Sequence, residues 1–119
     1  MIYIFSAFYA EAKNIIDHYG LKKEKSPEMV RFDVFANESI RLVITGVGEI
    51  NAAAAVSNIG GAYGISPDDE ILNVGCGAGF SSDICLGSIF LGNKLTEQMT
   101  GRTFYPDMLM KANFRECEI

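Results

Sequence analysis

Apolar and polar positions follow one another along this chain in blocks that predict both strands and helices. Residues 2–8 are apolar apart from Ser6, a pattern typical of a central strand. In residues 10–19 the apolar positions recur at the spacing of one face of a helix, and Gly20 is a suitable residue to end that helix. The chain therefore begins with a predicted strand followed directly by a helix.

The middle of the chain predicts a hairpin and a second helix. Residues 29–35 and 40–45 have the composition and alternation of two strands joined by a polar turn, whereas residues 22–27 are a polar turn. Residues 50–62 contain four consecutive alanines and predict a helix of small residues, which Gly60-Gly61, Gly64 and Pro67 are expected to break.

Residues 71–79 are the stretch around which we expect the chain to be organised. An apolar strand runs into a turn with three glycines in five residues. A strand without polar alternation is expected to be buried on both faces of a sheet covered by helices, and ligands of such sheets bind outside the carboxyl ends of the strands. Because glycine has no Cβ, backbone N–H groups of this turn can approach a sugar or an oxyanion closely. A tight turn without a ligand explains the same residues.

The remaining residues carry a weaker pattern. Residues 88–91 predict a further strand, 93–119 are expected to be irregular, and 108–114 could form a short segment of either kind. We find no repeat and no linker, so the chain is expected to be one domain, 1–119. The order of elements predicts an α/β layered fold.

Composition narrows the possible partners. The chain has 119 residues and a formal net charge of −5, without a basic stripe that could meet phosphates, so we expect no nucleic-acid partner. Its apolar start is too short to span a bilayer and lacks the basic region of a signal peptide, so we expect no membrane association. The three cysteines have no metal-ligand spacing, which favours a reduced, cytoplasmic protein, and we expect no cofactor and no metal.

Glu11 is the first residue with candidate chemistry. It falls where the first predicted strand meets the first helix, which is also the edge of the sheet at which ligands bind. The helix dipole favours a carboxylate in a first turn, so a structural role explains Glu11 equally well at this point.

Two familiar glycine motifs fit the chain only in part. A dinucleotide fingerprint would need glycine or alanine where Asn51 follows Gly46-Val47-Gly48 and where Phe80 follows the second turn. Residues 72–79 resemble the first motif of S-adenosylmethionine-dependent methyltransferases, but Asn73 takes the place of the usual acidic residue. Only residues 80–86 could form the helix that should follow, which is short for a crossover.

A third interpretation uses most of residues 1–92, because four short motifs occur in a characteristic order and spacing. They are Ala7-Phe8 with Glu11, then Thr45-Gly46-Val47-Gly48 with Asn51-Ala52-Ala53, then Asn73-Val74-Gly75-Cys76-Gly77-Ala78-Gly79, and last Leu86-Gly87-Ser88-Ile89. Together they resemble the N-terminal half of the nucleoside phosphorylase and nucleosidase family, and within it most closely the methylthioadenosine/S-adenosylhomocysteine nucleosidases.

The resemblance implies a three-layer αβα fold with a mixed central sheet, incomplete relative to the family. It implies that Glu11 is the base that handles the attacking water, and that Val47, Cys76, Gly77 and Ala78 line the pocket for the ribose and the base. Cys76 stands where the nucleosidases tend to have a small hydroxyl residue, and it could equally be a buried structural residue. Ala78 replaces a glycine of the family, and Ser88 replaces an aspartate.

The resemblance also bears on the acceptor and on the completeness of the site. The hexameric phosphorylases carry arginines in the segments where this chain has Asn73 and Glu11, so water is expected as the acceptor rather than phosphate. Members of the family are about twice as long, and their second half supplies the Met-Glu pair that holds the ribose and the Asp that protonates the purine. We therefore expect either part of a longer enzyme or a short protein that binds a nucleoside or assembles, and we expect 119 residues alone to be inactive. Apolar surface left uncovered would favour a homodimer or a higher oligomer.

Overall fold

The computed structural model of the chain describes residues 1–108 and 112–119. These residues form two compact units, Met1–Gly77 and Ala78–Ile119, where the sequence predicts one domain. The short segment expected over 108–114 lies partly outside the described residues. In the described part of the chain, no helix is both long and apolar enough to cross a membrane.

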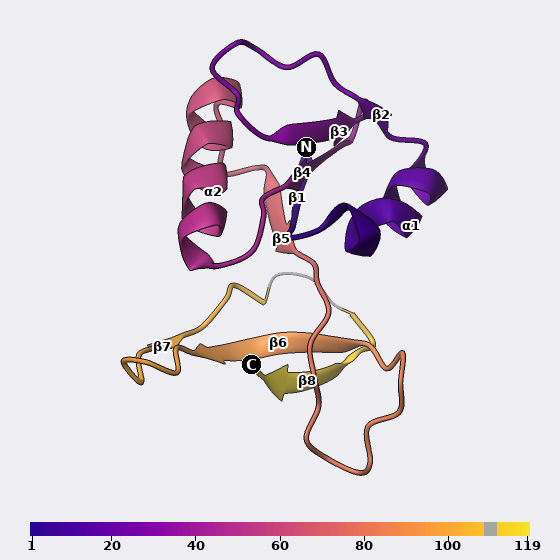
Figure 1. Cartoon of the computed structure of the whole chain (residues 1–119), viewed down its shortest axis with the longest axis vertical. Coiled ribbons are helices and arrows are strands. Elements are labelled where there is room, and N and C mark those ends of the chain that lie inside the picture. The colour runs from indigo at the N-terminus through magenta and orange to yellow at the C-terminus, as the bar shows by residue number, and fades with distance from the viewer. Residues whose placement is uncertain (109–111) are drawn as a thin grey trace. The chain divides into compact units, whose positions relative to one another are not determined.

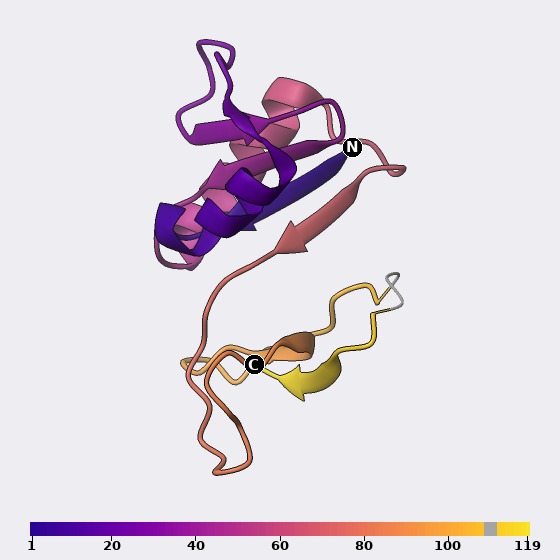
Figure 2. The same ribbon diagram turned by 90° about the vertical axis from the view of Figure 1, so that its right-hand side faces the viewer.

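The first unit contains a mixed five-stranded sheet in the order β2-β3-β4-β1-β5 (Figures 1 and 2). Its strands are β1 (Ile2–Ser6), β2 (Lys22–Lys23), β3 (Asp33–Ala36), β4 (Ile40–Ile44) and β5 (Glu70–Asn73). The interior strand β1 is parallel to both of its neighbours, β4 and β5, whereas β2, β3 and β4 pair in antiparallel fashion.

Two helices cover the two faces of this sheet, α1 (Tyr9–Tyr19) on one side and α2 (Glu49–Tyr63) on the other (Figure 1). Alternate residues of β1 point to opposite faces, so Ile4 packs beneath α1 while Tyr3 and Phe5 pack beneath α2. The core beneath α2 contains buried side chains at Tyr3, Phe5, Val34, Val43, Ala55 and Ile59. The core beneath α1 contains Ile4, Ala12, Ile16, Leu21, Ile40 and Leu42. The three-layer α/β fold with a mixed sheet is therefore confirmed.

Both helices of the first unit end at a glycine, although two other glycines lie inside α2. Gly20 takes a left-handed conformation (φ 62°) and ends α1 as predicted. Of the residues expected to break the second helix, Gly64 does end it in a left-handed conformation (φ 69°), whereas Gly60 and Gly61 do not interrupt it, because α2 continues to Tyr63. Ile59 is buried against the sheet and Tyr63 packs beside it, and this burial offsets the low helix propensity of the glycines between them.

The hairpin begins later than predicted. Residues 29–32 are not a strand, because Val30 N–H donates to Pro27 O (2.9 Å) in a turn. The Asn58 side chain on α2 binds the backbone on both sides of Val30, accepting from Arg31 N–H and donating to Met29 O. Lys22 and Lys23, expected in a polar turn, instead form the short edge strand β2.

The predicted position of residues 71–74 in the sheet is corrected. β5 is the edge strand of the first unit, and the side chain of Ile71 is 51% exposed rather than buried. Leu72 and Val74 do pack against the core beneath α1. An apolar run indicates that a strand has apolar neighbours, but the same run occurs in edge and central strands, so it does not give the strand order.

The second unit is a small three-stranded sheet of β6 (Phe90–Thr96), β7 (Thr103–Phe104) and β8 (Arg115–Glu118) in the order β7-β6-β8. The expectation that residues 93–119 are irregular is therefore wrong for 93–96, 103–104 and 115–118, which lie in these strands. β8 has only charged residues and one cysteine, and its pairing with β6 is supported by cross-strand side-chain contacts that local propensity does not reveal. These contacts join Asn93 to Glu116, and Lys94 and Thr96 to Glu118.

Candidate functional site

Three segments leave the sheet of the first unit at one edge, because parallel strands end on the same side. Beyond the paired strand residues, Thr45 N–H donates to Ser6 O (2.9 Å) and Val74 N–H donates to Phe5 O (2.9 Å). The ends of β4 and β5 are thereby tied to either side of the end of β1. This is the carboxyl edge at which open α/β sheets bind ligands.

Glu11 lies in the first turn of α1 and reaches back to this edge. Phe8 precedes the helix in extended conformation, and its N–H donates to Glu11 Oε2 (3.3 Å). Only the glutamate half of a capping box is made, since the Phe8 side chain has no atom that accepts a hydrogen bond. The helix start therefore holds the carboxylate at the edge of the sheet.

The carboxylate of Glu11 also contacts the glycine turn after β5. Cys76 N–H donates to Glu11 Oε1 (3.0 Å), although the two residues are 65 positions apart. A Cβ placed on Gly75 would lie 3.7 Å from the same oxygen, so the carboxylate rests directly on this part of the turn. The structure thus brings together two of the elements that the sequence analysis assigns to one site.

Ser6 is a residue of this site that sequence reasoning missed. Its side chain is 0% exposed, and its hydroxyl donates to Glu11 Oε2 (3.4 Å). The available signal was a single polar residue in an otherwise apolar strand, next to the predicted ligand edge.

The turn between β4 and α2 forms the other side of the same edge. Gly46 and Gly48 have positive φ values of 82° and 96°, which favour glycine. Asn51, the residue that breaks the dinucleotide fingerprint, donates from its side chain to Val47 O (2.6 Å) and so fastens this turn to α2. The side chain of Val47 is 59% exposed.

The predicted pocket residues divide between the two units. Val47, Cys76 and Gly77 belong to the first unit, whereas Ala78 begins the second unit and is described with it. Cys76 is exposed, so the alternative that it is a buried structural residue is wrong.

The structure also bears on the methyltransferase interpretation and on metals. Residues 74–89, all of which the structure describes, contain turns but no helix, whereas the methyltransferase motif needs a helix there. Among the described residues, no three or more His, Cys, Asp or Glu side chains gather as a metal site would require.

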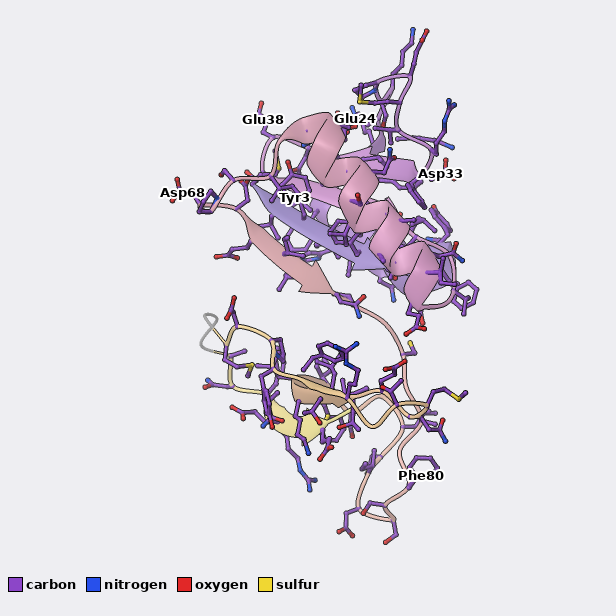
Figure 3. The ribbon with its side chains drawn as sticks, turned by 90° about the vertical axis from the view of Figure 1, so that its left-hand side faces the viewer. Tyr3, Glu24, Asp33, Glu38, Asp68 and Phe80 are labelled. Atoms are coloured by element: carbon purple, nitrogen blue, oxygen red, sulfur yellow. The ribbon has the colours of Figure 1, made fainter. Side chains whose placement is uncertain are left out.

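A second polar cluster lies at the opposite end of the sheet, near the end of α2 (Figure 3). Arg41 near the start of β4 makes two hydrogen bonds to Glu24 (3.0 and 3.2 Å), and its guanidinium lies 3.8 Å from the ring centroid of Tyr63. The hydrogen bonds from Arg41 hold the pKa of Glu24 below its usual value. This cluster joins the β2–β3 connection to β4 and α2. The Arg41 guanidinium is bound to Glu24, at the end of β4 away from Thr45.

Comparisons with known proteins agree with this arrangement. No family model matches the sequence, and no curated protein matches it. Among solved structures, a 5′-methylthioadenosine/S-adenosylhomocysteine nucleosidase from Neisseria meningitidis, in complex with methylthio-immucillin-A, superposes with a TM-score of 0.72 at 17% identity. That match covers 90% of this chain and 52% of the nucleosidase. This chain has the fold of the N-terminal part of that nucleosidase.

Two further structures give the same result. The Streptococcus pneumoniae nucleosidase of the same kind, in complex with 8-aminoadenine, matches with a TM-score of 0.62 at 19% identity, over 80% of this chain and 42% of that one. A futalosine hydrolase mutant of Helicobacter pylori matches with a TM-score of 0.65 at 16% identity, over 81% and 44%. The chain thus spans about half the length of the nucleosidases that it resembles.

Proposed function

We propose that this chain binds a purine nucleoside at the carboxyl edge of its first unit, and that Glu11 is the base for hydrolysis of the N-glycosidic bond. The observation that carries the proposal is the contact of the Glu11 carboxylate with the Gly75–Cys76 turn. The shared fold supports it, because the Neisseria and Streptococcus nucleosidase structures hold an immucillin and an aminoadenine.

In the proposed reaction the Glu11 carboxylate has one task, which is to take a proton from the attacking water. Cleavage passes through an oxocarbenium-like sugar, and the electron pair of the breaking C–N bond leaves with the purine. A water molecule forms the new C–O bond and gives one proton to Glu11, and in this chain the purine takes its proton from solvent. The Glu11 carboxylate contacts the turn at Gly75, where the absence of a side chain leaves a sugar room to approach it.

Water rather than phosphate is the proposed acceptor. Phosphate is held best by guanidinium groups that bind two oxygens at once. Arg41 is engaged by Glu24 away from the ligand edge, and Asn73 ends β5 where the phosphorylases carry an arginine. The rate of adenine release is therefore expected to be the same with and without added phosphate.

The expected activity is low. The family resemblance assigns the proton donor for the purine and the ribose clamp to a second half that this chain does not span. Without a general acid the rate is expected to be about 10²- to 10⁴-fold lower than that of a complete site. We also place the protein in the cytoplasm, because its three cysteines are free thiols.

The test is release of adenine from 5′-methylthioadenosine by the whole chain, followed by chromatography over long incubations. Glu11→Gln is expected to lower the release at least about 100-fold, because the amide cannot take a proton from water. Glu49→Gln, which changes an exposed carboxylate in the first turn of α2, is the matched control and should leave the rate unchanged. Equal rates in the wild type and Glu11→Gln would contradict the proposal.

A second candidate is a binding or assembly module without catalysis. Phe80 and Leu86 in the second unit are fully exposed, which favours association with a second copy. Binding of methylthioadenosine without adenine release would favour this alternative. A monodisperse monomer in sedimentation at micromolar concentration would count against the expected homo-oligomer.

A further inference from the structure

Ser6 donates to Glu11 from its side chain, whereas Phe8 and Cys76 donate from their backbone amides. It is the last residue of β1, and its carbonyl oxygen accepts from Thr45 N–H (2.9 Å) and from the Thr45 hydroxyl (3.4 Å). Its side chain is fully buried, so its hydroxyl has left water and needs an acceptor within the protein. The acceptor that the structure provides is Glu11 Oε2.

The donors around Glu11 are distributed unequally over the two carboxylate oxygens. Oε2 accepts from Ser6 Oγ and from Phe8 N–H, whereas Oε1 accepts from Cys76 N–H. An ionised carboxylate offers about four acceptor positions, two on each oxygen. Counting the donors among residues 1–108 and 112–119, these contacts fill both positions on Oε2 and leave one of the two on Oε1 open, beside the glycine turn.

We propose that Ser6 is a positioning residue that selects Oε1 of Glu11 as the oxygen that takes the proton from water. This inference rests on the proposed function. The Ser6 hydroxyl and the Phe8 amide fix Oε2 from the side of the sheet, which turns the open position of Oε1 toward the bound sugar. Without the hydroxyl, the carboxylate is held on Oε2 by one donor and can rotate away from Cys76.

The first arm of the test needs no activity. In the isotope-labelled whole chain, nuclear magnetic resonance measures the chemical shift of the Cys76 amide proton. The Glu11→Ala variant gives the chemical shift of this proton without the hydrogen bond. Ser6→Ala is expected to change the chemical shift of this proton toward the value in Glu11→Ala. The double variant should change the chemical shift no further than Glu11→Ala does. Ser57→Ala, at an exposed serine of α2, is the control and should leave the proton in place.

If folded Ser6→Ala has the same Cys76 amide proton chemical shift as the wild type, the inference is overturned. If Ser6→Ala does not fold, Ser6→Cys keeps the volume of the side chain but donates weakly, and it is expected to give an intermediate position. An unshifted proton in Ser6→Cys would overturn the inference equally.

The second arm measures adenine release. Ser6→Ala is expected to lower kcat roughly tenfold to 100-fold through misplacement of the base, with KM nearly unchanged, and to have no effect in the Glu11→Gln background. A change confined to KM would overturn the positioning role. Absence of both binding and release in the wild type would overturn the proposed function, whereas the amide proton would still decide whether Ser6 positions the carboxylate.

Discussion

Each of the two units of this chain contains a β-sheet, but the units differ in what covers the strands. In the described part of the chain, every buried apolar side chain lies between Tyr3 and Ile59, in the first unit. There, two helices close both faces of the sheet. In the second unit, Phe80 and Leu86 are fully exposed, and Figure 3 shows Phe80 on a loop of that unit. Backbone pairing alone therefore yields a sheet, but a core requires a second layer.

The largest expected difference between the units is in amide hydrogen exchange. Amides of β1 and β4 should exchange only on global unfolding, because both strands lie beneath two helices. Amides of β6 and β8 should exchange on the order of 1,000-fold faster, since local opening exposes no core. Equal protection in the two sheets, measured by nuclear magnetic resonance, would break the comparison.

Truncation of one leucine in each unit compares how much a buried and an exposed side chain contribute to the free energy of unfolding. Leu42 is 0% exposed in the core beneath α1, so Leu42→Ala is expected to lower the free energy of unfolding by about 2–5 kcal/mol. Leu86→Ala in the second unit is the matched control and should change it by no more than about 0.5 kcal/mol. Urea denaturation measures both, and similar losses would show that the second unit has a core of its own.

The smallest expected effect concerns the polar cluster of the first unit. Because the hydrogen bonds from Arg41 hold the pKa of folded Glu24 below its ordinary value of 4.5, the ionised form stabilises the fold above that pH. Glu24→Gln should lower the free energy of unfolding by about 1–3 kcal/mol at pH 7. The difference from the wild type should shrink as the pH falls from about 4.5 through the folded pKa. Glu28→Gln, at an exposed site, is the control, and a gap that persists in acid would contradict the assignment.

The sequence predicted the layered part of the fold well, because apolar periodicity reports burial. The strand beginning at Ile2 and the helix ending before Gly20 occur as expected. Periodicity could not place β5 at the edge, since strand order depends on pairing between distant segments. It also missed β8, whose charged residues owe their conformation to partners on β6.

The candidate site could be predicted in part for a similar reason. Glu11 was marked by its place at a junction of strand and helix, and the turn at Gly75 by its glycines. Ser6 carries no local signal of its partner, because a lone serine in a strand is as often a packing choice as a hydrogen-bond donor. Only the folded chain shows that its hydroxyl faces the Glu11 carboxylate.

The place of β1 in the sheet has a consequence for the order in which the chain can fold during synthesis. β1 is made before β4 and β5, yet it pairs with β4 on one edge and with β5 on the other. The pairs with β5 join Ile2 to Glu70 and Phe5 to Asn73. Contacts this distant in sequence slow folding, and an unpaired strand edge is a site of aggregation. The nascent chain therefore carries an open apolar edge until β5 leaves the ribosome, so chaperone demand should be greatest just before that point.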